Sequence, residues 1–228
     1  MWPTGNSVWV VIAAFNEARV IARVIADVTG SGYRAVVVDD GSIDDTARVA
    51  ARAGAIVIRH SINLGQGAAL QTGIDYALDE EADYVVTFDA DGQHRAQDIA
   101  VLLDALGEHG ADFALGSRFL GKSIDLPPSR HMLLKAATWF TRLTTGLNLT
   151  DTHNGLRAMT RHGASRIALR QNRMAHASEI LEQIAHSGLA YIEVPVTIEY
   201  SAYSLAKGQR LADSISILLD LSARRLQR

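Results

Sequence analysis

The sequence of 228 residues contains no cysteine and only four prolines. Without cysteine there can be no disulfide framework and no thiolate zinc site, a pattern that suits the cytoplasm. No run of about 20 apolar residues occurs, so we expect no membrane-spanning helix. The apolar stretch after residue 7 is short and strand-like, so we expect no signal peptide. A soluble chain, at most attached to a membrane surface, is the resulting expectation.

An excess of basic residues is also lacking, because the formal net charge at pH 7 is −3. This balance argues against a nucleic-acid-binding protein that relies on bulk positive charge. Hydrophobic residues make up 48% and charged residues 21% of the chain, as in ordinary soluble proteins. The length is sufficient for one large α/β domain, so we expect a single domain over residues 1–228.

Two common nucleotide-binding motifs are missing as well. A dinucleotide-binding oxidoreductase requires G-x-G-x-x-G after its first strand, but residues 13–17 read A-A-F-N-E. The nearest match, at residues 65–70, follows the third expected strand and lacks the last glycine. No G-x-x-x-x-G-K-[ST] segment occurs either. These absences exclude an NAD-binding fingerprint and a P-loop.

Short apolar runs alternate with helical patterns through the first half of the chain. Strands are expected at residues 8–13, 35–38, 55–58, 84–88, 112–117 and 190–200. Helices are expected to end near Thr29, Ala53 and Leu78. Such alternation predicts an α/β fold with a doubly wound, mostly parallel sheet, whose ligand crevice lies at the carboxyl ends of the strands. Pro195 favours an edge position for the last strand.

The strand at residues 84–88 runs directly into Asp89-Ala90-Asp91-Gly92. Side chains two residues apart in an extended segment point to the same side, so both carboxylates should converge at the end of a core strand. Two adjacent acids repel each other unless a cation joins them, and a hard divalent ion is the economical partner. An isolated D-x-D-G is more often a simple turn, so the decision depends on the other motifs.

Four ordered motifs supply that context: A-A-F-N-E at 13–17, V-D-D-G-S-I-D-D-T at 38–46, N-L-G-Q-G-A-A at 63–69 and F-D-A-D-G-Q-H at 88–94. Together they resemble family 2 glycosyltransferases, which are inverting enzymes with the GT-A fold. Within that family the pattern is most similar to polyprenyl-phosphate sugar transferases such as dolichol-phosphate mannose synthase. The likeness is close over about residues 8–120 and looser to about 210. Members usually have proline at the position of Ala14 and often lysine at that of Gln66.

The resemblance implies a donor half over about residues 1–120, which binds a nucleotide-diphospho-sugar with Mg²⁺ or Mn²⁺. The implied donor-binding residues are Ala14, Phe15, Glu17, Asp39, Asp40, Asp89, Ala90, Asp91, Gln93, Lys207 and Arg210. Asp89, Asp91 and Gln93 are the implied metal ligands. Within this set, Asp40 is expected to cap the Gly41-Ser42 turn. Asp44 is expected to be a helix N-cap, and His94 is as consistent with a surface turn.

The acceptor half is expected over about residues 121–228. The implied catalytic residues are Asp91, Arg118, Asp151 and Arg157; Asp151-x-x-x-Gly155-Leu156-Arg157 resembles the family's acceptor-side motif. Five arginines and no acid occur between Gly155 and Ser178, which suits a phosphate-bearing acceptor. We expect Asp151 to orient Arg157 rather than to remove a proton. Residues 129–147 form an amphipathic pattern that would permit peripheral membrane contact.

The resulting prediction is inverting transfer of a sugar from a nucleotide-diphospho-sugar to a polyprenyl phosphate (dolichyl or undecaprenyl). One alternative is transfer to a saccharide hydroxyl, which would require a general base. Another is a sugar-nucleotide nucleotidyltransferase, but that class needs a glycine-rich basic loop after the first strand. A catalytically inactive binding module would have lost the acids, and here they are intact. The sequence indicates neither the oligomeric state nor the donor sugar.

Overall fold

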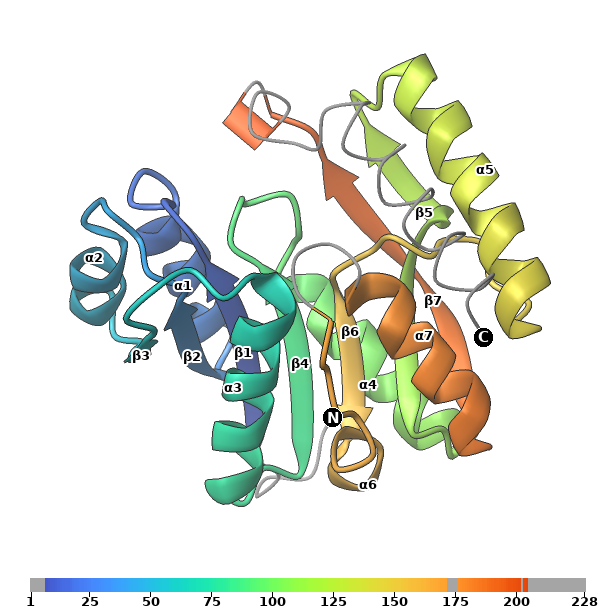
Figure 1. Ribbon diagram of the computed structural model, residues 1–228, viewed down its shortest axis with the longest axis horizontal. Helices are drawn as coiled ribbons and strands as arrows, with labels where there is room; N and C mark the ends of the chain where they lie inside the picture. Colours follow the sequence, from blue (N-terminus) through green and yellow to red (C-terminus); the bar gives the residue numbers. More distant parts are fainter. Residues whose placement is uncertain (1–6, 172–175, 202, 205–228) are drawn as a thin grey trace.

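The computed structural model describes residues 7–171, 176–201 and 203–204 (Figure 1). Within them, one sheet has the strand order β3-β2-β1-β4-β6-β5-β7. The strands are β1 (Val8–Ala14), β2 (Arg34–Asp39), β3 (Ile56–Arg59), β4 (Tyr84–Asp89), β5 (Phe113–Ile124), β6 (Arg157–Thr160) and β7 (Tyr191–Glu199). Every neighbouring pair is parallel except the two that involve β6. The predicted mostly parallel α/β sheet is confirmed, with β7 and its proline at an edge.

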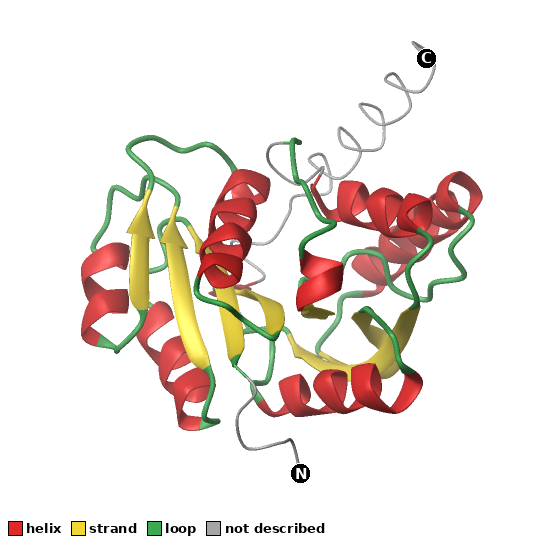
Figure 2. Cartoon of the chain, turned by 90° about the horizontal axis from the view of Figure 1, so that it is seen from below, coloured by secondary structure: helices red, strands yellow, loops and turns green. Residues whose placement is uncertain are grey.

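Helices cover both faces of the sheet (Figure 2). They are α1 (Ile21–Gly30), α2 (Thr46–Arg52), α3 (Gln66–Asp79), α4 (Gln97–His109), α5 (Pro128–Thr145), α6 (Arg161–Ala164) and α7 (His176–Ser187). Apolar side chains of α1 and α4 form one core cluster with the sheet, and those of α3 and α7 form a second on the opposite face. Helix α5 lies beside β5 (Figure 1). Among the described helices, none is both long enough and apolar enough to cross a bilayer.

The central strand β1 explains why both faces need helices. Val10 and Ile12 join the cluster with α1 and α4, whereas Trp9 and Val11 join the cluster with α3 and α7. Successive side chains of a strand point to opposite faces, so a continuous apolar run is stable only when both faces are buried. All four of these side chains are at most 1% exposed.

Two local expectations differ from the structure. Helix α2 begins at Thr46 with Asp45, not Asp44, at the N-cap position. The Asp44 carboxylate instead accepts hydrogen bonds from the backbone N–H groups of Thr46 (3.0 Å) and Ala18 (3.2 Å). It therefore ties the loop after β1 to the loop after β2, which is a contact between segments distant in sequence. The second difference is β6, a strand of only four residues that the sequence pattern did not predict.

The direction of β6 decides which residues meet at the ligand-binding edge. Strand β4 ends at Asp89 on this edge, and β6 pairs with it in the antiparallel sense, with Thr87 opposite Arg157. An antiparallel strand begins where its neighbour ends. The first residue of β6 and the loop that precedes it therefore lie next to the acids that follow β4.

Candidate active site

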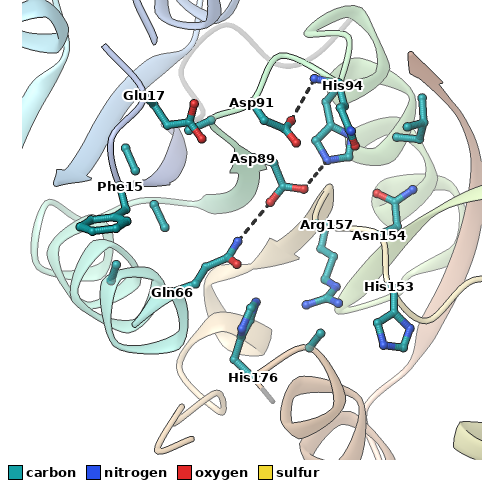
Figure 3. A pocket seen from close by; sticks show the side chains of 18 of the residues that line it. Phe15, Glu17, Gln66, Asp89, Asp91, His94, His153, Asn154, Arg157 and His176 are labelled. Atoms are coloured by element: carbon teal, nitrogen blue, oxygen red, sulfur yellow. Dashed lines mark hydrogen bonds and ion pairs between the residues drawn. The ribbon is translucent and has the colours of Figure 1, made fainter. Parts of the chain in front are cut away.

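A cavity of about 680 Å³ opens at this edge of the sheet. Its walls come from the ends of β1 and β4, the start of α3, the 153–157 segment and the first residues of α5 and α7 (Figure 3). A volume of this order is typical of sites that enclose a small ligand. Polar residues from both halves of the chain therefore share one space, as open α/β sheets generally arrange at the strand ends.

Asp89 and Asp91 both line the cavity, and their environments differ. The Asp89 carboxylate contacts His94 Nε2 (2.9 Å) and accepts from Gln66 Nε2 (3.3 Å). Burial by itself raises the pKa of Asp89, but the hydrogen bond and charge of His94 outweigh it and hold that pKa below its usual value. Burial, and then the neighbouring Asp89, raise the pKa of Asp91 to about 6. The repulsion between the two acids therefore appears at Asp91, whose pKa is raised, and not at Asp89, whose pKa is lowered.

Gly155 explains how Asp89 can sit against the opposite segment. A Cβ atom at position 155 would lie 2.3 Å from both carboxylate oxygens of Asp89. The Gly155 carbonyl in turn accepts a hydrogen bond from Thr87 Oγ1 (2.7 Å), which fixes the segment on β4. Only glycine permits this approach, so the glycine of the acceptor-side motif has a steric role beside the first acid.

His94 is not a surface turn residue. Its side chain is 2% exposed, and its ring packs edge-on against Phe88 with centroids 5.3 Å apart. Its Nδ1 atom has no hydrogen-bond partner in the described part of the chain, so its polar contact there is the one to Asp89. The imidazole therefore anchors the first acid and leaves the second to face the ligand. Spacing alone could not reveal this, because an i, i+5 contact requires the tight turn at Gly92.

The donor set at Asp91 fits a hard divalent cation. Asp89, Asp91 and Gln93 all line the cavity and offer carboxylate and amide oxygens. Burial and the neighbouring Asp89 raise the pKa of Asp91, and a bound cation would favour its ionised form. No three histidine, aspartate or glutamate residues within the described ranges are grouped closely enough to hold a metal by themselves. Such a site suits Mg²⁺ or Mn²⁺, which commonly take one or two carboxylates and complete their shell with substrate phosphates.

The other expected donor residues divide into two groups. Ala14, Phe15, Glu17, Asp40 and Ala90 line the cavity, with Phe15 42% exposed at its rim. Asp39 does not line it: this residue is fully buried. Lys207 and Arg210 lie outside the described residues. The Glu17 carboxylate accepts a hydrogen bond from Tyr203 (2.8 Å), so a residue that follows β7 reaches the donor side.

The turn-capping duty that we expected of Asp40 falls to Asp39. Asp39 accepts the Ser42 N–H (3.1 Å) and pairs with Arg59 (3.2 Å), so it, rather than Asp40, caps the turn. Asp40 accepts the backbone N–H groups of Leu64 (2.9 Å) and Gly65 (2.7 Å). Asp40 therefore holds the loop that leads into α3. The prediction that Asp40 caps the Gly41-Ser42 turn is wrong, because the loop between β3 and α3 places the backbone of residues 64 and 65 next to its carboxylate.

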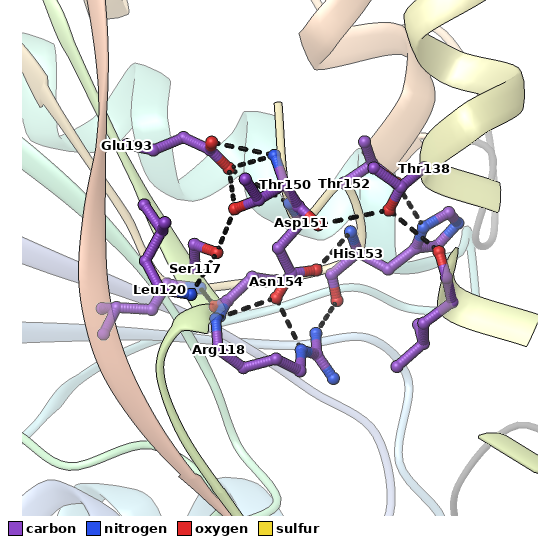
Figure 4. Close-up of polar contacts among 12 residues, drawn as sticks. Ser117, Arg118, Leu120, Thr138, Thr150, Asp151, Thr152, His153, Asn154 and Glu193 are labelled. Carbon is purple, nitrogen blue, oxygen red and sulfur yellow. Dashed lines mark hydrogen bonds and ion pairs between the residues drawn. The ribbon is translucent and has the colours of Figure 1, made fainter. Parts of the chain in front are cut away.

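On the acceptor side, the partner of Asp151 is Arg118 and not Arg157. Asp151 Oδ2 accepts from Arg118 Nε (2.6 Å) and from the Arg118 backbone N–H (3.1 Å), and the pair is buried (Figure 4). Arg118 also donates to Tyr200 and to the carbonyl of His153 (2.7 Å). The expectation that Asp151 orients Arg157 is wrong. Asp151 is absent from the cavity lining, whereas Arg118 belongs to it, so the carboxylate holds a lining arginine from behind.

Arg157 is a buried cation that lines the cavity, together with Arg118 and Arg130. It is 4% exposed, and its side chain forms no hydrogen bond or ion pair with any residue that the structure describes. Burial lowers the pKa of Arg157 to about 10, while Asp89 and Asp151 act in the opposite direction. The group is therefore still charged at neutral pH. A buried guanidinium without a fixed partner is costly, and an anionic ligand in the cavity would relieve that cost.

The sequence did not single out three further cavity residues: His153, Asn154 and His176. Asn154 caps its own segment by accepting the Leu156 N–H (3.0 Å). His176 opens α7 and lies near Asp89, where its charge acts to lower the pKa of that acid. Only the position of His153 and Asn154 inside the acceptor-side motif could have indicated them. Nothing in the local pattern marked His176.

Comparison with known proteins then identifies the family. Residues 9–168 match the model described as glycosyl transferase family 2. The chain belongs to this family. It is 35% identical to an uncharacterized protein of Methanocaldococcus jannaschii over 95% of this chain and 91% of that protein. It is 29% identical to the UDP-N-acetylglucosamine–dolichyl-phosphate N-acetylglucosaminyltransferase of Methanococcus voltae, over 94% of each chain.

The family 2 fold is also recovered among solved structures. Glucosyl-3-phosphoglycerate synthase of Mycobacterium tuberculosis, solved with Mn²⁺, UDP-glucose and phosphoglyceric acid, superposes with a TM-score of 0.74. The match covers 96% of this chain and 80% of that one at 20% identity. The GT-A glycosyltransferase fold implied by the motifs is thereby confirmed.

The buried pair of Arg118 and Asp151 generates a stability prediction for this family 2 domain. Asp151→Asn should lower the free energy of unfolding by about 3–5 kcal/mol, because it leaves a buried guanidinium without its counter-charge. Glu199→Gln is the matched control, since it breaks the half-exposed pair with Arg95 and should cost at most about 1 kcal/mol. Urea unfolding followed by circular dichroism measures both. Equal effects of the two variants would contradict the structural role of Asp151.

Proposed function

We propose that this family 2 member is an inverting, metal-dependent glycosyltransferase that moves a sugar from a nucleotide-diphospho-sugar to a polyprenyl phosphate. The observation that carries this proposal is the character of the acceptor wall. Of the cavity residues contributed by 118–177, three are arginines (Arg118, Arg130 and Arg157) and none supplies a carboxylate. The cavity carboxylates Glu17, Asp40, Asp89 and Asp91 all come from the donor half. The name of the Methanococcus voltae relative, which uses dolichyl phosphate, supports the same acceptor class.

The chemistry of the acceptor makes this distribution of charge useful. A sugar hydroxyl needs a general base to remove its proton, whereas a phosphate monoester is already largely dianionic, its second pKa being about 6. The latter needs cations to bind and align it. In this proposal Arg157 holds the acceptor phosphate so that one of its oxygens attacks the sugar C1 from the side opposite the diphosphate. The C1–O bond to the diphosphate breaks as the new bond forms, and the anomeric configuration inverts.

The donor would occupy the other end of the cavity. Phe15 at the rim can stack on the base, and Glu17 can accept from a ribose hydroxyl once Tyr203 yields its place. Asp91 and Gln93, with Asp89 behind them, would hold Mg²⁺ or Mn²⁺ on the diphosphate. The bound cation would neutralise the negative charge that develops on the leaving nucleoside diphosphate. His94 keeps Asp89 ionised and fixed while this charge changes.

The apolar end of the cavity provides an exit for the isoprenoid chain. Pro127, Leu133, Leu134 and Ile198 line it. Just outside, Met132, Trp139 and Leu143 of α5 are 75%, 65% and 64% exposed, and their spacing places them on one face of the helix. Lys135 and Arg142 lie along one side of this stripe. A basic amphipathic helix of this kind can lie on an anionic bilayer, which would bring the lipid-linked phosphate to the cavity.

The metal prediction separates binding from stability. Without metal, Asp91→Asn should leave the melting temperature unchanged or raise it, because the substitution removes repulsion with Asp89. In the wild-type protein, Mn²⁺ with a nucleoside diphosphate should raise the melting temperature by binding the folded state. Both the rise in melting temperature and the transferase activity should vanish in Asp91→Asn. The activity should also vanish when EDTA is added to the wild-type protein. A metal-induced rise that persists in Asp91→Asn would rule out this site.

The acceptor prediction concerns Arg157. Arg157→Met should lower kcat/KM for a polyprenyl phosphate about 100-fold or more, since a charge-assisted contact to phosphate is lost. The same change should leave nucleoside diphosphate affinity within about twofold and should increase thermal stability, because it removes an unpaired buried cation. Arg52→Met, an exposed substitution at the end of α2, is the control. Efficient wild-type transfer to a saccharide hydroxyl, with none to polyprenyl phosphate, would overturn the proposed acceptor.

The membrane prediction is tested on α5. The wild-type protein should sediment with liposomes that contain anionic lipid, and Trp139→Ser with Leu143→Ser should reduce binding about tenfold by removing buried apolar area. Val101→Ser, on the exposed side of α4, is the matched control because it removes a similar apolar side chain elsewhere. Binding that is unaffected by the α5 changes would show that another surface meets the lipid.

A further inference from the structure

His153 is held at three of its four polar atoms by the protein itself (Figure 4). Its backbone N–H donates to Asp151 Oδ1 (3.2 Å), and its carbonyl accepts from Arg118 Nη2 (2.7 Å). Its ring Nδ1 contacts Thr152 Oγ1 (2.9 Å). A residue held at both its backbone and its ring has little freedom to turn, so the direction of the remaining ring nitrogen is set by the fold.

That remaining atom, Nε2, forms no hydrogen bond with any residue in the described ranges, and His153 lines the cavity beside Arg157 (Figure 3). The residue is therefore not a core histidine whose ring nitrogens are both satisfied. A ring with one nitrogen fixed by the protein and the other open to a cavity has the arrangement of a ligand-binding group, because the fixed nitrogen determines what the open one can offer.

The ring is neutral at physiological pH. Burial lowers the pKa of His153 to about 4; Arg118 and Arg157 act in the same direction, and Asp151 opposes them. With Thr152 donating its hydroxyl to Nδ1, the open Nε2 carries the hydrogen. The other tautomer would turn a lone pair toward any anion in the cavity. An anionic ligand beside Arg157 thus selects the form in which Nε2–H donates.

We propose that His153 binds the acceptor by donating its Nε2–H to a phosphate oxygen, next to the guanidinium of Arg157. This assignment rests on the proposed phosphate acceptor and names a specificity-determining residue for it. A neutral donor gives a directional hydrogen bond without placing a third positive charge beside Arg118 and Arg157. The same ring is too weak a base to take a proton from a sugar hydroxyl, so it favours an acceptor that arrives already ionised.

Glu193 supports this arrangement from β7. Its carboxylate accepts the backbone N–H groups of Thr150 (2.8 Å) and Asp151 (3.1 Å) and the Thr150 hydroxyl (3.0 Å). Strand β7 thereby anchors the start of the 150–154 segment. Asp151, held in this way, in turn binds Arg118 and the backbone N–H of His153. Glu193 is accordingly a positioning residue for the ring and does not itself contact the ligand.

The test compares two replacements of His153 with farnesyl phosphate as the acceptor probe. His153→Phe keeps the ring shape and removes both nitrogens, whereas His153→Gln keeps an N–H donor at a similar reach. The Phe variant should raise KM for farnesyl phosphate about 10- to 100-fold, the usual loss for a hydrogen bond to a charged group. The Gln variant should stay within about threefold of wild type. In both, calorimetric affinity for a nucleoside diphosphate with Mn²⁺ should be unchanged.

Further measurements separate the possible failures. Wild-type protein that does not glycosylate farnesyl phosphate or longer polyprenyl phosphates would refute the proposed function itself. If wild type is active but both variants keep its KM, or lose activity and melting temperature together, the assignment of His153 is wrong. Nitrogen-15 NMR should show one histidine, absent from the His153→Gln spectrum, that stays neutral down to pH 5 and carries its hydrogen on Nε2 when farnesyl phosphate is bound. A histidine at this position that is protonated at pH 6 would likewise overturn the proposal.

Discussion

The hydrogen-bonded ladder between β4 and β6 is the constraint on which the candidate active site depends. It joins the strand that ends in the acidic motif to the strand that begins with Arg157, and it does so in the antiparallel sense. The preceding glycine can then approach the Asp89 carboxylate closely. If β6 ran parallel to its neighbours, its first residue would lie at the far edge of the sheet. Donor and acceptor groups would then be separated by the length of a strand.

This geometry leaves charge separated across the cavity. Carboxylates from the first half of the chain line one side, where Asp91 has a raised pKa, and Arg157, whose pKa is lowered, lines the other. In both cases burial is the largest cause of the shift, because it penalises the charged form of the side chain. A cation bound to the diphosphate and an anionic acceptor would compensate these costs separately, each on its own side. The arrangement is thus suited to one cationic and one anionic ligand. Holding these charges buried without the ligands lowers the stability of the folded protein.

The ion pair of Arg118 and Asp151 differs from these groups, because each charge has a partner of opposite sign in direct contact. Both oxygens of Asp151 have donors, and Arg118 donates to three different residues. Such a pair contributes rigidity to the 150–154 segment, and its arginine also lines the cavity. With Glu193 behind it, the segment can present His153 and Arg157 in fixed directions to the cavity. Precise positioning of this kind matters when catalysis relies on alignment instead of proton transfer.

Much of the sheet could be predicted from local pattern. Short Val-rich runs such as residues 84–88 are typical of buried strands, and Pro195 cannot donate a ladder hydrogen bond, so β7 belongs at an edge. Strand β6 escaped prediction because its four residues form neither a continuous apolar run nor a strict apolar–polar alternation. The burial of His94 was missed because its contact with Asp89 depends on the turn at Gly92.

The sequence by itself determined the parallel α/β architecture, the pair of acids at the end of a central strand and the basic character of the segment around residue 157. These follow from chain-local properties: side-chain period, turn residues and charge. Only the tertiary structure decided which charges meet. Asp151 is closer in sequence to Arg157 yet pairs with Arg118, because the fold brings the 150–154 segment against the middle of β5. Partners of buried charges are chosen by the approach of distant segments, which no local spacing encodes.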